Sequence, residues 1–245
     1  MAGEVEYSAS LRSSLEESLK SAFSQPYLRL TSKPKSPGGF FHVRLENFSR
    51  LAHYDDGLEQ GVIEILTSDR RQTPFSGGFV ALFELGPARH YALRHASLSV
   101  FHDIVGEPIP LFRAEWDEVA ASDKASQHAQ PHWHFVQSPR RIESIIRTLM
   151  KPSGQTGEFS PEQPVELLSG LVDCGRFHFA MTSMWEKSET PPYQKRTFDS
   201  VSFPKWFRNL SSYVADQIAY LVTHMPPESA PEARPFVPSE AEADG

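Results

Sequence analysis

The residue types best able to do chemistry gather in two short segments, residues 111–117 and 130–135. The first reads Leu-Phe-Arg-Ala-Glu-Trp-Asp and the second reads Gln-Pro-His-Trp-His-Phe. Successive side chains of a β-strand point to opposite faces, so a strand over each segment separates aromatic rings from polar groups. The polar groups are Arg113, Glu115, Asp117, His132 and His134.

We expect these two segments to pair, because a slip of one residue would expose the rings of both strands. Pairing gathers the polar groups on the face opposite the rings. Histidine exchanges protons near neutral pH, and we expect His132 and His134 to act as general acid and base. Glu115 or Asp117 would orient one imidazole, and Arg113 would stabilise the charged transition state.

The residues that follow predict binding of an anion. A helix is expected over residues 139–151, because Pro139 suits the first helical position, and its free N–H groups attract anions. Arg140 and Arg141 lie in its first turn, where the helix dipole disfavours cations, so we expect them to face a ligand. With His128 they form the predicted substrate-binding set. RNA or a nucleotide is the predicted substrate, and a metal-independent ribonuclease is the simplest enzyme of this kind.

Two other interpretations use the same histidines. A His-x-His pair on a strand directs both rings to one side, and His128, Glu115 or Asp117 can complete a set of metal ligands. The glycines and the glutamate of a cupin-type motif are absent around this pair, and the sequence identifies no cofactor. Alternatively, the histidines are structural and bond only loop backbone and one another.

The two segments also resemble those of TumE-type toxin proteins of bacterial toxin–antitoxin pairs. In that family an Arg-Tyr-Asp segment precedes a Pro-His-His-x-His stretch, whereas here the first acid is glutamate and the spacing differs. The resemblance implies a bacterial toxin or phage-defence setting with RNA as the target. A non-catalytic subunit of such a multi-protein complex is the alternative. The matching positions are Arg113, Glu115 or Asp117, Pro131, His132 and His134.

The periodicity of apolar residues predicts an α+β fold, in which an antiparallel, meandering sheet of about five to seven strands is packed by C-terminal helices. Helices are predicted over 139–151 and 203–224. The apolar phase changes within one strand, and we expect a β-bulge near His95 there. Besides the two segments above, the predicted strands cover residues 41–45, 61–66, 78–85 and 90–102.

The N-terminal part predicts a separate element. Apolar residues recur every fourth position of a helix over residues 8–24, which leaves a narrow stripe suited to docking a protein partner. The Pro- and Gly-rich stretch 32–39 is expected to be a linker or a turn. The predicted organisation is an N-terminal, partner-docking helix in 1–30, one α+β domain in 38–225, and a disordered, acidic, proline-rich tail in 226–245.

Composition narrows the class of protein. The net charge is −7, but residues 226–245 hold five acids against one arginine, which leaves about −3 elsewhere. This charge argues against a protein that coats DNA nonspecifically, although it permits a local basic site. The single cysteine, Cys174, excludes an intrachain disulfide and suits a reducing cytosol. No apolar run approaches a membrane span and no secretory signal is predicted, so the expected location is the cytoplasm.

Overall fold

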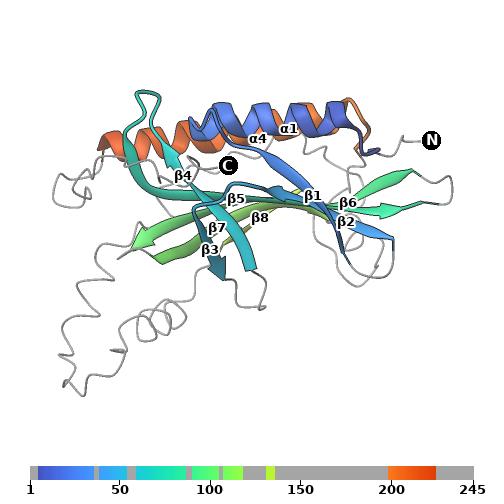
Figure 1. Ribbon diagram of the computed structural model, residues 1–245. Coiled ribbons are helices and arrows are strands. Elements are labelled where there is room, and N and C mark those ends of the chain that lie inside the picture. Colours follow the sequence, from blue (N-terminus) through green and yellow to red (C-terminus); the bar gives the residue numbers. More distant parts are fainter. Residues whose placement is uncertain are drawn as a thin grey trace, which may run out of the picture.

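The computed structural model describes residues 5–35, 39–53, 59–86, 90–104, 107–117, 131–135 and 198–224. In these parts of the chain the α+β fold is confirmed: an antiparallel sheet is covered by two helices (Figure 1). The sheet has eight strands, one more than the upper end of the expected range. The helix predicted over 139–151 and the tail predicted over 226–245 lie outside the described residues.

The strands pair with antiparallel neighbours across a sheet of order β1-β2-β5-β6-β7-β8. The long strand β5 shares one of its edges between two partners, since residues 72–78 pair with β4 and residues 80–84 pair with β2. Strand β3 pairs with β4. The bounds are β1 (Leu30–Lys35), β2 (Phe40–Leu45), β3 (Arg50–His53), β4 (Glu59–Leu66), β5 (Gln72–Leu85), β6 (Tyr91–Ile104), β7 (Glu107–Asp117) and β8 (His132–Phe135).

Four strand assignments differ from the sequence predictions, one of them β7, which begins at Glu107 rather than at Leu111. The linker expected over 32–39 is wrong for its first half, because these residues continue β1 and pair with β2. Strand β1 is at one end of the sheet order, and a proline is tolerated on such an edge. Strand β3 was not predicted, and β5 begins at Gln72 rather than at Gly78.

The bulge predicted near His95 is confirmed. Leu82 of β5 lies opposite His95 of β6. The next residue of β5, Phe83, lies opposite Leu93, so Arg94 is the extra residue. An inserted residue changes the phase of a strand, and the two parts of β6 can therefore both present apolar side chains to the same core.

Helix α1 (Ala9–Phe23) lies within the helix predicted over 8–24, and Ser8 is its N-cap. The hydroxyl of Ser8 accepts a hydrogen bond from the backbone N–H of Leu11 at 3.0 Å. The stripe from Leu11 to Phe23 is buried in the core, against the sheet and the second helix. The face expected to dock a partner is therefore covered by the chain itself.

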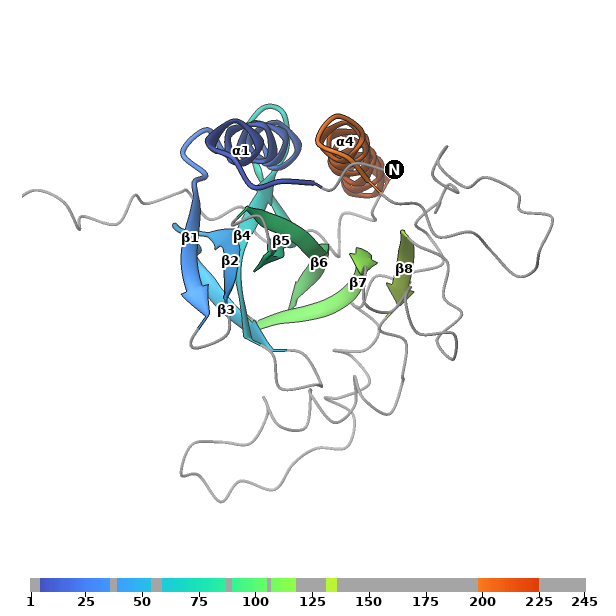
Figure 2. The same ribbon diagram turned by 90° about the vertical axis from the view of Figure 1, so that its right-hand side faces the viewer.

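Helix α4 (Ser202–His224) confirms the helix predicted over 203–224. It lies beside α1 on the same face of the sheet, so the fold has one helical layer and one sheet layer (Figures 1 and 2). Neither helix has a stretch long and apolar enough to cross a membrane. The core side of α4 is lined by Phe203, Trp206, Phe207, Leu210, Val214, Ile218 and Leu221.

Candidate functional site

The register of β7 and β8 gives this part of the sheet an aromatic face and a polar face, because opposed residues of antiparallel strands share a face. Phe112, Ala114 and Trp116 of β7 are buried toward the helices. Trp133 of β8 packs against this core, with its ring centroid 5.7 Å from that of Phe112. The common aromatic core predicted for the two segments is therefore present for Trp133, whereas Phe135, predicted on the same face, is 44% exposed.

The same register brings the predicted chemical groups together on the polar face. Arg113 lies opposite His134, and Glu115 lies opposite His132. Figure 2 shows β7 and β8 side by side, with both helices on the other side of the sheet. The predicted pairing of the two segments is confirmed.

The side chains make short contacts around one carboxylate. Oε1 of Glu115 lies 2.6 Å from Nε2 of His134 and 3.2 Å from Nε2 of His132. The two Nε2 atoms are 2.6 Å apart. The other carboxylate oxygen, Oε2, lies 2.7 Å from Nε of Arg113. We call these four side chains the Glu115 cluster.

Glu115 is nearly buried, with 6% of the residue exposed. Burial alone would raise the pKa of this carboxyl group. The hydrogen bonds from His132 and His134 and the charge of Arg113 outweigh burial, and they hold the pKa of Glu115 well below its usual range. The carboxylate is therefore ionised at neutral pH. The side chain of His134 is 43% exposed, so the cluster opens to solvent beside this imidazole.

Asp117 shares the polar face of β7 but lies two residues beyond Glu115, next to β6. It is opposite His95 of β6, and its Oδ2 lies 3.7 Å from Nδ1 of that histidine. Of the two acids that the sequence offered as partners of the imidazoles, Glu115 is the one within hydrogen-bond distance of them. The predicted substrate-binding residues His128, Arg140 and Arg141 lie outside the described residues.

A second charged group on the polar face was missed by the sequence analysis. Oδ2 of Asp103 lies 2.8 Å from Nη2 of Arg50 and accepts a hydrogen bond from Oγ of Ser76 at 2.5 Å. Burial raises the pKa of Asp103 although Ser76 and Arg50 oppose the shift. Recognition of this group requires the position of β3, which carries Arg50 and has too few residues for a periodic pattern.

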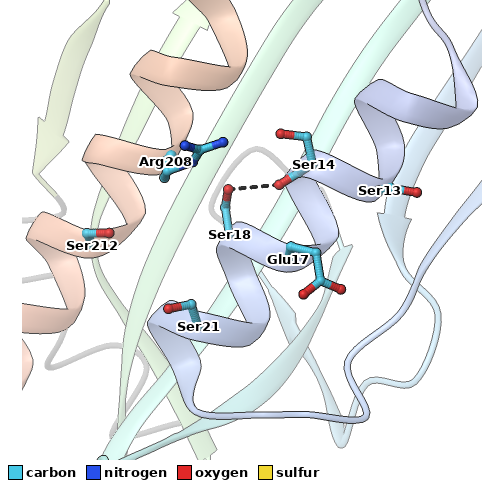
Figure 3. A pocket seen from close by; sticks show the side chains of 7 residues that line it. All are labelled: Ser13, Ser14, Glu17, Ser18, Ser21, Arg208 and Ser212. Atoms are coloured by element: carbon cyan, nitrogen blue, oxygen red, sulfur yellow. Dashed lines mark hydrogen bonds between the residues drawn. The ribbon is translucent and has the colours of Figure 1, made fainter.

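The helical layer contains a groove of about 470 Å³ between α1 and α4. Figure 3 shows the groove, with Arg208 of α4 facing α1. On α1 the hydroxyl of Ser18 donates a hydrogen bond to the backbone carbonyl of Ser14 at 2.8 Å. The groove lies on the opposite side of the sheet from the Glu115 cluster, and none of the residues that line it belongs to the cluster. Its lining residues are Ser13, Ser14, Glu17, Ser18, Ser21, Arg208 and Ser212.

The Glu115 cluster thus combines an ionised carboxylate, two imidazoles and a guanidinium group on two adjacent strands. Such a set can move protons beside a bound anion, or it can hold a metal ion through the carboxylate and the imidazoles. No protein-family model matches this chain, and neither a curated protein nor a solved structure matches it.

Proposed function

We propose that the chain is a phosphodiester hydrolase that acts on RNA or nucleotides at the Glu115 cluster. The observation that carries the proposal is the position of Arg113, which contacts Glu115 beside the two imidazoles. A phosphodiester requires a cation for its non-bridging oxygens and proton-transferring or metal-binding groups next to that cation. The cluster contains both kinds of group.

Hydrolysis requires that water, or a ribose 2′-hydroxyl, attacks phosphorus while the bond to the leaving oxygen breaks and that oxygen gains a proton. The two imidazoles support this reaction in one of two ways. They act as general base and general acid, or they hold a metal ion that lowers the pKa of water. Glu115 orients an imidazole in the first case and is a metal ligand in the second. Arg113 stabilises negative charge on the phosphorus oxygens in both cases.

The resemblance to TumE-type toxins supports RNA as the class of substrate. The residues that carry the resemblance are on β7 and β8, which also carry the Glu115 cluster. We therefore propose a bacterial toxin–antitoxin or phage-defence setting, with the chain acting in the cytoplasm.

The proposal is tested with the purified full chain on labelled RNA and on bis(p-nitrophenyl) phosphate. We expect His134→Ala and Glu115→Gln each to lower the cleavage rate by about 100-fold or more, which is the usual range for loss of such a group. His95→Ala is the matched control, since it removes an imidazole from the same face outside the cluster, and it should retain the wild-type rate. Absence of cleavage by the wild-type chain, or equal rates in all four proteins, would overturn the proposal.

A further inference from the structure

The three atoms at the centre of the Glu115 cluster form a closed triangle. Its corners are Oε1 of Glu115 and the Nε2 atoms of His132 and His134, and its sides are 2.6, 2.6 and 3.2 Å. A ring nitrogen has one in-plane direction, which holds either a proton or a lone pair. Two nitrogens therefore make two directed contacts at most, whereas the triangle has three close contacts. Hydrogen bonds alone do not satisfy this arrangement.

We propose that Glu115, His132 and His134 bind a divalent transition-metal ion, with zinc as the ion that suits hydrolysis. A cation beside the triangle accepts a lone pair from all three atoms at once. Zinc lies about 2.0–2.2 Å from nitrogen and oxygen ligands, so the ligand atoms of a tetrahedral site are about 3.3–3.6 Å from one another. The side of 3.2 Å is close to this range, whereas the two sides of 2.6 Å are about 0.7 Å below it. Both short sides meet at Nε2 of His134, so an outward shift of this half-exposed side chain by somewhat less than an ångström, about 0.7 Å, opens the site for the ion.

The surroundings of the carboxylate suit a metal ligand. Oε2 of Glu115 forms an ion pair with Arg113, while Oε1 is directed at the two imidazoles. An outer partner of this kind fixes the orientation of a ligating carboxylate and commonly contributes to metal affinity. The register of β7 and β8 positions the three ligands. It places Glu115 directly opposite His132 and diagonally across from His134, which lies two residues further along β8.

The site also has the ligand number of a catalytic metal centre. Three protein ligands leave at least one position for water, and the exposed side chain of His134 places that position near solvent. Bound zinc lowers the pKa of water to about 7, which produces a nucleophile at neutral pH. This catalytic role rests on the proposed function, but binding of the ion is measurable without any substrate.

The pair formed by His95 of β6 and Asp117 of β7 provides an internal control. His95 and Asp117 are residues of the same types on the same face, but they form a pair 3.7 Å apart and belong to no group of three convergent ligands among the described residues. If a metal ion binds imidazoles and carboxylates nonspecifically, its affinity should fall both when His95 is removed and when a histidine of the Glu115 cluster is removed. An ion bound at the Glu115 cluster responds only to changes in that cluster.

The test is calorimetric titration of the chelator-treated full chain with zinc chloride. We expect one equivalent of zinc per chain, at least about 100-fold weaker binding in His132→Ala and His134→Ala, and unchanged binding in His95→Ala. Arg113→Lys should weaken binding about 10- to 100-fold, as loss of an outer partner does. Cobalt chloride gives a second readout, because its visible absorption in the wild-type chain should disappear in His134→Ala. Circular dichroism confirms that each variant is folded.

Two outcomes separate this inference from the proposed function. Zinc bound at one equivalent and lost in the cluster variants, without cleavage of RNA or bis(p-nitrophenyl) phosphate, supports the metal site and overturns the hydrolase. Cleavage at the full rate by chelator-treated protein that binds no zinc on titration, lost in the same variants, supports the hydrolase and overturns the metal site. Binding of zinc that is equal in the wild type and in a His132→Ala/His134→Ala double variant also overturns the metal site.

Discussion

Arg113 and Glu115 are two residues apart on β7, and Nε of Arg113 lies 2.7 Å from Oε2 of Glu115. The carboxylate is almost buried, whereas the side chain of Arg113 is 26% exposed. A buried charge that loses its partner destabilises the folded state. Arg113 therefore supports the ionised state of Glu115, in addition to the role that we propose for it on a substrate.

We expect Arg113→Ala to lower the free energy of unfolding by about 1–3 kcal/mol, because it leaves a buried carboxylate without its cation. The larger loss seen for fully buried pairs does not apply, since water reaches Arg113. In a chain that already carries Glu115→Gln, Arg113→Ala should cost much less, because a neutral amide needs no cation. Urea unfolding of the two single variants, the double variant and the wild type measures the coupling. A coupling energy near zero would contradict this assignment.

Histidine 102 should make stability depend on pH. Burial lowers the pKa of His102 to about 4, from 6.5 in an exposed chain. Between these values the unfolded chain binds more protons than the folded chain, so stability is complete above about pH 6.5 and falls as the pH is lowered toward 4. The expected loss is about 3 kcal/mol over this window.

Denaturant unfolding at pH 7.5 and 4.5 measures this effect, with His102→Leu as the comparison. The variant should lose less stability than the wild type between the two pH values. Glu115 does not mask the effect, because its depressed pKa removes stability only below its ordinary value of 4.5. Equal losses in the two proteins would show that His102 is not the group responsible.

Gly77 allows α1 to approach the sheet. A Cβ atom at this position would lie 2.3 Å from Cζ of Phe23, whose ring is fully buried. We expect Gly77→Ala to destabilise the chain by about 1–3 kcal/mol through overpacking. Addition of Phe23→Leu to this variant should recover part of the loss, as measured by thermal and urea unfolding.

Gly61→Ala is the matched control for this prediction. A Cβ atom there would also meet a phenylalanine ring, that of Phe48, at 2.6 Å. The ring of Phe48 is exposed and can turn toward solvent, which leaves only the contact of 2.9 Å with its Cβ atom, so Gly61→Ala should be the milder substitution. An equal loss in the two variants would mean that close packing of α1 is not the cause.

The sequence predicted most of the candidate site because alternation is a local property of a strand. It placed Arg113 and Glu115 on one face of β7 and the two histidines on one face of β8. It did not decide between Glu115 and Asp117, since these acids share a face and are two residues apart. Only the register of β7 and β8 decides between them, and no pattern within either strand specifies that register.

The predictions that failed concern elements without a local pattern. Residues 30–35 combine lysines with a proline and show no apolar alternation, because β1 is an edge strand. Strand β3 has four residues, which is too few for a period to be recognised. The apolar stripe of α1 was recognised, but its partner was not. An apolar stripe has the same sequence pattern whether a second protein or the chain's own sheet covers it. Here the sheet covers it, because Gly77 has no side chain and leaves room for the ring of Phe23.

The division of β7 into two faces has a consequence for how this chain can diverge. Codons for residues 113, 115 and 117 specify the reactive face, while those for residues 112, 114 and 116 specify the packing that keeps the domain folded. Natural variation at the first set can therefore replace one chemistry with another without loss of the scaffold where residues 113 and 115 change together, because Arg113 stabilises the buried carboxylate of Glu115. We expect descendants of a common ancestor to keep the buried positions longer than the polar ones wherever selection for the proposed activity is relaxed.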